Sequence, residues 1–265
     1  MITILVSYAL FGAVAGVLAG LLGIGGGLVI VPILVYCLGV QGVSESQIMH
    51  IALGTSMASI VFTSVSSFMA HHRRGAVRWD VVKRIALGIL TGTYLGSCVA
   101  SKLSTGPLKV IFVVFLYYVA TQLLLDRRPK ASRGLPGNLG MFGVCNGIGA
   151  VSSFVGIGGG TLSVPFMLWC NIPTHTAIGT SAAIGFPIAV AGTVVYVVNG
   201  LSTAGLPDWS LGYVYLPALV GIVGLSVLTA PLGVRLAHSL PVDRLKRVFA
   251  VLLYVVGTRM LVSIL

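Results

Sequence analysis

Short polar stretches divide the chain into eight apolar segments. These cover approximately residues 2–38, 48–70, 81–101, 107–125, 137–172, 175–199, 211–234 and 247–265. Six of the segments have the roughly 20 residues that a helix needs to cross the hydrocarbon core of a bilayer. The first and the fifth are nearly twice as long, and each contains a cluster of glycines. The pattern predicts an all-α, polytopic membrane protein with two segments that are not simple spanning helices.

The composition supports the membrane assignment and changes how the charge is interpreted. Hydrophobic residues make up 57% of the chain, charged residues 8%, and the mean hydropathy is +1.05, whereas soluble proteins carry roughly 25% charged residues. The net charge of +11 would favour nucleic acid binding in a soluble domain with a basic face. The sequence has no such segment, so we expect no nucleic acid partner, and the basic residues instead indicate topology in a lipid bilayer.

The glycine clusters are two copies of one five-residue string, Gly-Ile-Gly-Gly-Gly. They occupy residues 23–27 and 156–160, and a proline, Pro32 or Pro165, follows five residues after each string. Each glycine weakens a helix by about 1 kcal/mol relative to alanine, because glycine loses the most backbone freedom on folding. The strings therefore predict that each long apolar segment is a helix hairpin that turns at its glycines.

Further matches indicate that the whole chain is repeated. Residues 50–56, His-Ile-Ala-Leu-Gly-Thr-Ser, match residues 175–181, His-Thr-Ala-Ile-Gly-Thr-Ser. Near the end of each half, Lys, Phe, Tyr, Thr and Leu recur at a constant spacing of 137 residues. We interpret residues 1–125 and 137–265 as two transmembrane repeats, each a hairpin followed by about three spanning helices. Residues 126–136 form a basic cytoplasmic linker between them.

The distribution of Lys and Arg decides how often the long segments cross. If each returns to the side from which it entered, thirteen basic residues face the cytoplasm and three lie outside; if each crosses once, the split is ten to six. The positive-inside rule favours the first arrangement. It gives two repeats of inverted topology with both termini outside, the architecture with which secondary transporters build a central site. Whether the hairpins span the bilayer or are re-entrant stays open.

The doubled motif G-[IV]-G-G-G-x-x-x-V-P, each copy followed by A-[LI]-G-T-S, resembles the TauE/SafE sulfite exporter family of membrane permeases. The resemblance extends over essentially the whole chain. It implies transport of small sulfur-containing anions, such as sulfite, sulfoacetate and related organosulfonates, across the bacterial cytoplasmic membrane. Which of these anions is carried, and whether by export or uptake, does not follow from the motifs.

The glycine turns are the first candidate for the substrate site. At the start of a half-helix, backbone N–H groups with no side chain over them attract an anion, and the helix dipole adds to the attraction. The alternative is that the glycines only let neighbouring helices approach closely. The candidate residues are Gly25, Gly26, Gly27, Gly158, Gly159 and Gly160.

The Gly-Thr-Ser motifs supply the second set of candidates, Thr55, Ser56, Thr180 and Ser181. We expect them in the first turns of the helix after each hairpin, where a pseudo-twofold axis brings both copies to one place and their hydroxyl groups donate to the substrate. The alternative is that these hydroxyls bond back to carbonyl groups of their own helices, as is common in membranes.

Two equivalent histidines, His50 and His175, lie near the ends of predicted spans. Anchoring at the membrane interface is the simpler role, and a pH-dependent gate is the alternative, because imidazole titrates near neutral pH. A basic run at residues 71–74, His-His-Arg-Arg, indicates a cytoplasmic loop and would also concentrate anions at the inner mouth.

The predicted spans contain no carboxylate, since all five acids are placed in loops, so we do not expect a buried Asp or Glu proton relay. The four cysteines have no CxxC spacing, which gives no sign of a metal site or a cofactor. We therefore expect a facilitative, potential-driven anion exporter that works by alternating access and is not an enzyme. A cation or metal transporter, an intramembrane enzyme and a non-transporting subunit are the alternatives, and whether the protein forms a homodimer stays open.

Overall fold

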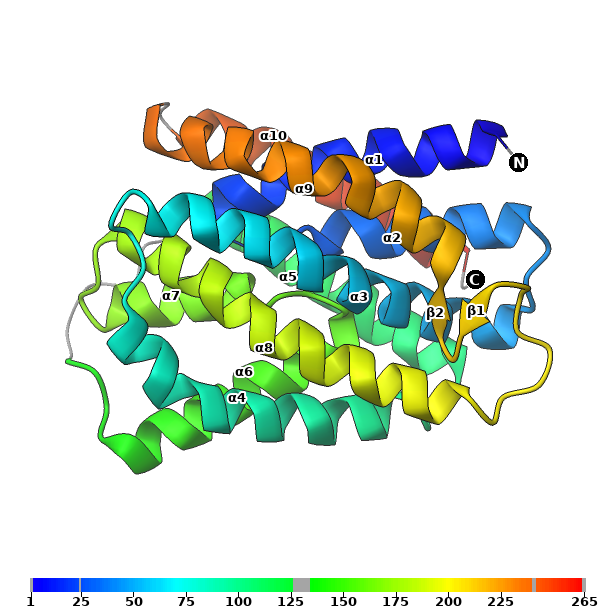
Figure 1. The fold of residues 1–265 in the computed structure, drawn as a ribbon, viewed down its shortest axis with the longest axis horizontal. Helices are drawn as coiled ribbons and strands as arrows, with labels where there is room; N and C mark the ends of the chain where they lie inside the picture. Colours follow the sequence, from blue (N-terminus) through cyan, green and yellow to red (C-terminus); the bar gives the residue numbers. More distant parts are fainter. Residues whose placement is uncertain (1, 24, 126–133, 240–241, 264–265) are drawn as a thin grey trace.

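Helices make up almost all of the fold, which the computed structural model describes for residues 2–23, 25–125, 134–239 and 242–263. This part of the chain contains ten α-helices and one small β-hairpin (Figure 1). Their bounds are α1 Ile2–Leu22, α2 Gly27–Val40, α3 Glu45–His72, α4 Trp79–Ala100, α5 Thr105–Leu125, α6 Asn138–Val155, α7 Gly160–Trp169, α8 Thr174–Gly200, β1 Ser210–Leu211, β2 Val214–Tyr215, α9 Leu216–Ser239 and α10 Val242–Val262. Most of the predicted linker, residues 126–133, lies outside the described residues. The all-α class is confirmed, and the two-residue strands are an addition that the apolar pattern does not reveal.

Both long apolar segments are broken at their glycine strings. α1 ends and α2 begins around Gly23, Gly25 and Gly26, whose φ angles are 69°, 75° and 81°. α6 and α7 are separated in the same way at Gly156 and Gly159, with φ angles of 65° and 75°. Left-handed backbone of this kind is costly for a residue with a Cβ. The strings therefore end one helix and set the direction of the next.

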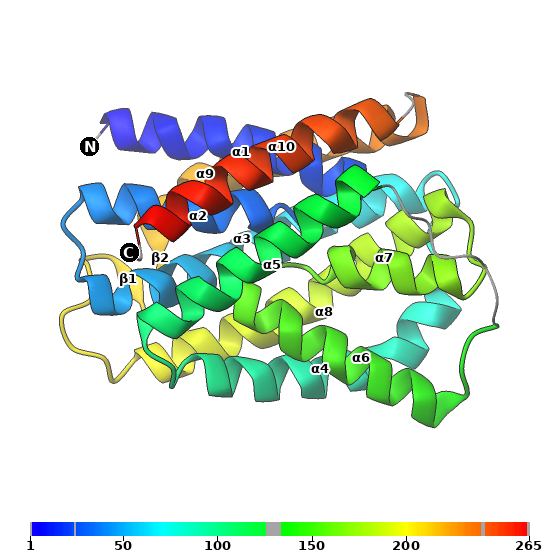
Figure 2. The same ribbon diagram turned by 180° about the vertical axis from the view of Figure 1, so that it is seen from behind.

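The two broken segments enter the bundle from opposite ends. α1 starts at the end of the bundle where α10 finishes, and α2 returns to that end (Figures 1 and 2). α6 starts at the other end, and α7 returns there. This second end, which we call the basic end, is also where α3 turns into α4 and where α9 finishes, and it carries the exposed residues Arg73, Arg74, Arg78, Arg84 and Arg235. Exposed basic residues gathered at one end are the pattern that the positive-inside rule predicts for a cytoplasmic side.

Five helices of the described chain, α3, α5, α6, α8 and α9, are long and apolar enough to cross a membrane. α2 and α7 are apolar but shorter, with 14 and 10 residues, as expected for helices that begin inside a bilayer. α3 is the most enclosed of the spanning helices, whereas outer helices expose apolar side chains such as Leu87, Val114 and Val220. The protein is therefore a multi-pass membrane protein built around α3.

Helix backbones touch along two rows of glycines, and within each row the glycines are four residues apart. One row lies on α1 against α9 and the other on α4 against α6: Gly12, Gly16 and Gly20, and Gly88, Gly92 and Gly96. A Cβ added to Gly16 would lie 2.3 Å from the carbonyl oxygen of Ser226, and one added to Gly92 would lie 2.0 Å from that of Asn146. Small residues at this spacing are a general means of close helix packing in membranes. Neither row was predicted as a contact, because the sequence does not reveal which helix a glycine faces.

The helix contacts recur in an exchanged form. α1 packs against α9 as α6 packs against α4, and α2 packs against α3 as α7 packs against α8. The contact of α3 with α9 in the same way corresponds to that of α8 with α4. Two further contacts join equivalent helices of the two halves, α3 with α8 and α5 with α10. Replacing α1 to α5 by α6 to α10 in order therefore reproduces the same main contacts. Two copies of one unit related by a twofold axis would pack in this way.

Candidate functional site

The two glycine turns meet each other inside the bundle. A Cβ built on Gly25 would lie 3.4 Å from the Cα of Gly158, and one built on Gly158 would lie 3.5 Å from the Cα of Gly25. A Cβ built on Gly27 would lie 2.2 Å from the carbonyl oxygen of Gly156. The two turns therefore touch through their backbones, which requires positions without side chains.

The turns place two helix N-termini in the region where they meet. Gly26 and Gly159 are the N-caps of α2 and α7, and all six candidate glycines are buried. Within the described part of the chain, the N–H groups of these glycines donate to no backbone carbonyl group. Uncovered N–H groups at the positive ends of two helix dipoles form a suitable environment for an anion.

Ser56 and Ser181 tie each turn to the opposite half of the chain. The Oγ of Ser56 donates to the carbonyl oxygen of Gly156 at 2.8 Å, and the Oγ of Ser181 donates to that of Gly23 at 3.2 Å. Ser181 Oγ also lies 2.8 Å from Ser163 Oγ. Both tying serines are fully buried. In this structure their hydroxyl groups hold the turns in position.

Thr55 and Thr180 are also fully buried, but their oxygen atoms act as acceptors. Thr55 Oγ1 accepts the backbone N–H of Tyr215 at 2.9 Å, just before α9, and Thr180 Oγ1 accepts that of Arg78 at 3.1 Å, just before α4. The expectation that Gly-Thr-Ser lies in the first turns is wrong for the first copy, because α3 begins at Glu45, ten residues before Thr55. Each threonine therefore fixes the start of a neighbouring helix from within the bundle.

A row of buried polar side chains, the α3 polar row, continues from Thr55 to the basic end. Its members recur every four residues: Thr55, Ser59, Thr63, Ser67 and His71. Ser59 and Thr63 donate back to the carbonyl group one turn earlier, and Thr63 Oγ1 also lies 2.8 Å from Ser226 Oγ of α9. The matching positions of α8 are Thr180, Ile184, Ile188, Gly192 and Tyr196. The row is thus polar along α3 and largely apolar along α8.

Thr161 is a polar residue beside the second turn that was not predicted from the sequence. It is the second residue of α7, and its side chain is 8% exposed. Its Oγ1 is buried without a hydrogen-bond partner in the described structure. The matching position in the first half is Leu28, so the second turn is the more polar one. The signal was present in the sequence, because a threonine and a leucine directly follow two identical glycine strings.

The two equivalent histidines lie in different surroundings. His50 is buried near the start of α3, where its Nε2 donates to the carbonyl oxygen of Leu103 at 2.9 Å, and its ring is 5.0 Å from that of Tyr213. His175 is exposed at the start of α8, and its ring stacks on that of His238 at 4.8 Å. Their equivalence in the sequence is therefore not matched by equivalent contacts.

Two acidic side chains lie at helix ends, away from the turns. The prediction that all acids lie in loops is wrong for Glu45 and Asp80, which occupy the first turns of α3 and α4, and for Asp243, the second residue of α10. A carboxylate is stabilised there by the helix dipole. Glu45 also pairs with the buried Lys109, and Asp80 with the exposed Arg78. Among the described residues, no group of three His, Cys, Asp or Glu side chains is arranged to hold a metal ion.

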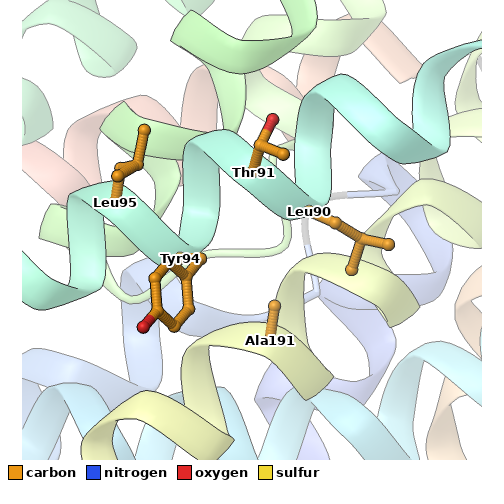
Figure 3. Close-up of a pocket in the computed structure, with 5 residues that line it drawn as sticks. All are labelled: Leu90, Thr91, Tyr94, Leu95 and Ala191. Carbon is orange, nitrogen blue, oxygen red and sulfur yellow. The ribbon is translucent and has the colours of Figure 1, made fainter.

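A pocket of about 430 Å³ lies between α4 and α8, away from the turns (Figure 3). Its lining residues are Leu90, Thr91, Tyr94, Leu95 and Ala191. The walls are apolar and include none of the predicted site residues. An oxyanion would find no positive charge there, so we do not assign this pocket to the substrate.

Known proteins resemble the chain over most of its length. The family model for sulfite exporter TauE/SafE matches residues 8–260. A probable membrane transporter protein of Haemophilus influenzae is 40% identical over 98% of this chain and 99% of its own length. The probable membrane transporter protein YunE of Bacillus subtilis is 30% identical over 71% of this chain and 77% of its own length. A probable membrane transporter protein of Methanocaldococcus jannaschii is 25% identical over 94% of this chain and 92% of its own length. No solved structure matches the chain significantly.

Proposed function

Because the chain belongs to the TauE/SafE sulfite exporter family, we propose that it carries small sulfur-containing anions, such as sulfite, sulfoacetate or related organosulfonates, across the cytoplasmic membrane. Two observations support membrane transport as the general activity: the relatives are probable membrane transporter proteins, and the chain is a multi-pass helix bundle. The proposed direction is export, and the anion leaves chemically unchanged.

The observation that carries the proposal is the meeting of the two glycine turns. The proposed anion lies between the N-termini of α2 and α7, where glycine N–H groups that donate to no described backbone carbonyl come from both halves. Hydrogen bonds to a charged acceptor are shorter and stronger than neutral ones, so a few such donors suffice for a small oxyanion. The proposed donors are the N–H groups of Gly25, Gly26, Gly27, Gly158, Gly159 and Gly160.

Hydroxyl groups around the turns complete the proposed site. Thr55 and Thr180 each accept a backbone N–H and have no acceptor for their own protons among the described residues, which leaves those protons for the substrate. The hydroxyl of Thr161 has no partner at all within the described structure. Ser56 and Ser181 serve the site by holding the turns in place.

The proposed mechanism is alternating access between two inverted repeats, residues 1–125 and 137–265. The exchanged helix contacts and the opposite entry of the two hairpins support this division (Figures 1 and 2). The hairpin of α1 and α2 opens toward the outer end, and that of α6 and α7 opens toward the basic end. A tilt of one repeat against the other would then expose the same central site to each side in turn.

The proposed driving force is the membrane potential. Moving one negative charge outward down an inside-negative potential is favourable by about 2.3 kcal/mol per 100 mV, and a dianion gains about twice that. The test uses the full chain in vesicles loaded with labelled sulfite, with a potential imposed by a potassium gradient and an ionophore. Efflux should accelerate with the potential. Efflux no faster than from protein-free vesicles would overturn the proposal, and efflux that follows only a proton gradient would replace the mechanism by proton coupling.

Replacing Thr161 with valine should lower sulfite efflux in these vesicles by about tenfold, because one hydrogen bond to the anion is worth about 1.4 kcal/mol. Valine has nearly the same shape, and the hydroxyl loses no protein partner within the described structure, so thermal stability should not fall. Thr161→Ser should keep most of the flux. Thr93→Val is the matched control, because Thr93 is also buried without a described partner but lies where α4 meets α6. Equal flux in both valine variants would remove Thr161 from the site.

A further inference from the structure

Three imidazole rings from three helices meet at the basic end. His71 lies at the end of α3, His238 at the end of α9 and His175 at the start of α8. The ring centroids of His71 and His238 are 5.6 Å apart, and those of His238 and His175 are 4.8 Å apart with the rings stacked. We call these residues the histidine cluster. It runs from the buried His71 to the exposed His175.

The hydrogen bonds of the cluster define where a proton can be added. His71 is fully buried, and its Nε2 lies 2.9 Å from the carbonyl oxygen of Gly20. A carbonyl oxygen only accepts, so Nε2 carries the hydrogen, and Nδ1 of the neutral ring is left with a lone pair. That Nδ1 is buried and has no partner in the described structure, and the same holds for Nε2 of His238. Buried polar atoms without protein partners are uncommon, and a bound ion or water is one explanation for them.

The charges around the cluster favour an anion as that group. The charged and titratable groups that face His71 are His238, Arg74 and His175, and α1, which supplies the Gly20 carbonyl, brings no charged side chain. An Nη1 of Arg74 donates to the carbonyl oxygen of Val234, one turn before His238. Among the described side chains no carboxylate faces these groups. A protonated cluster would therefore be a site of positive charge with uncovered donors.

We propose that the histidine cluster and Arg74 form a second anion site at the cytoplasmic mouth, which takes up one proton together with the anion. The proton comes from solvent and binds Nδ1 of His71, because Nε2 is already bonded to Gly20. The anion accepts from that new N–H, from His238 and from Arg74. The second anion site depends on the proposed function in one respect, which is that anions must pass through the cytoplasmic mouth.

The proton stays at the mouth when the anion moves on. The members of the α3 polar row between His71 and the glycine turns are Ser67, Thr63 and Ser59, whose hydroxyls do not titrate in this range. The potential therefore remains the driving force, while acidity on the cytoplasmic side raises the rate at which anions are collected. The equivalent of His175 at the other end, His50, is bonded to Leu103 and has no histidine neighbour among the described rings, so the device is present at one end.

Sulfate is a suitable probe, because its charge is constant over the relevant pH range. Calorimetric titration of the purified full chain with sulfate, in buffers of different ionisation enthalpy, measures both affinity and protons taken up. Affinity should rise by about tenfold between about pH 8 and about pH 6, with about one proton bound per sulfate at the lower end. Sulfate affinity that does not change with pH in the native protein would overturn the proposal, and so would an absence of sulfate binding.

The variants separate this site from its neighbours. His71→Gln removes the nitrogen that takes the proton and should abolish the proton uptake. His238→Ala removes one donor to the anion and should lower sulfate affinity at about pH 6 by about tenfold, and it is the safer test because His238 is only half-buried. His72→Gln is the matched control, since His72 is exposed in the same basic run and bonds to Trp79, and it should behave like the native protein. Unchanged sulfate affinity in His238→Ala would overturn the proposal, and so would proton uptake that persists in folded His71→Gln. Thr161→Val should retain the proton uptake, so failure of the central site and failure of this one give different results.

Discussion

In a Gly158→Ala variant that folds and inserts normally, sulfite flux should fall by a factor of about 30 or more. The methyl group would block at least one charge-assisted hydrogen bond to the anion, and such a bond is worth about 2 kcal/mol. Gly158 does not have a positive φ, so alanine is not strained there. Its methyl group would lie 3.4 Å from Ile60 Cγ2 and 3.5 Å from the Cα atoms of Gly25 and Gly185, which are ordinary contacts. The fold thus tolerates the methyl group, which would lie between the two turns beside the N–H groups that we propose bind the anion.

The measurement compares flux in vesicles with yield and thermal stability in detergent. Gly147→Ala is the control, because Gly147 is an exposed glycine of α6 with nothing within 4 Å of an added Cβ. Flux that survives in Gly158→Ala at native stability would contradict an anion site at the turns. It would favour the simpler interpretation, in which the glycine strings only let the helices pack.

A Gly92→Leu variant should yield little folded protein, with the free energy of unfolding lowered by about 3 kcal/mol or more. The added Cβ would lie 2.0 Å from the carbonyl oxygen of Asn146 and 2.7 Å from its Cα, both backbone atoms that a rotamer change cannot move. α4 and α6 would have to separate along their whole contact. Loss of this contact removes one of the two closest helix pairs of the fold.

The control for this variant comes from the facing helix. Gly147→Leu places the same side chain on α6, where a Cβ meets nothing within 4 Å and leucine would face lipid. Folded yield by size-exclusion chromatography and the thermal midpoint should fall for Gly92→Leu and stay near native for Gly147→Leu. Equal behaviour of the two variants would show that close approach at Gly92 does not support the fold.

The features predicted from the sequence are those with a local physical cause. Glycine strings end helices through their own backbone freedom, so the breaks at residues 23–27 and 156–160 were visible in advance. The gathering of exposed basic residues at one end was also predictable, because the charge of each loop acts on topology separately. In both cases the cause lies within a few residues of the effect.

The contacts that were missed join residues far apart in the chain. Thr55 bonds to Tyr215, 160 residues away, and Thr180 bonds to Arg78, 102 residues away. No periodicity of α3 or α8 indicates these partners. The contact between His71 and His238 is of the same kind, since each histidine alone looks like the end of a span. Thr161 could have been identified as a candidate from the sequence, because it places a hydroxyl group directly after the second glycine string, where the first half has Leu28.

The pairing of α1 with α9 has a consequence for the order of assembly. α1 is made before α9, but the surface on which its glycine row packs belongs to residues 216–239 of α9. At about 5–20 residues per second, roughly 10 to 40 s of synthesis separate the two helices. During that interval the glycine face of α1 is without the helix that covers it in the folded protein. α1 can therefore reach its final packing only after nearly all of the bundle has been made.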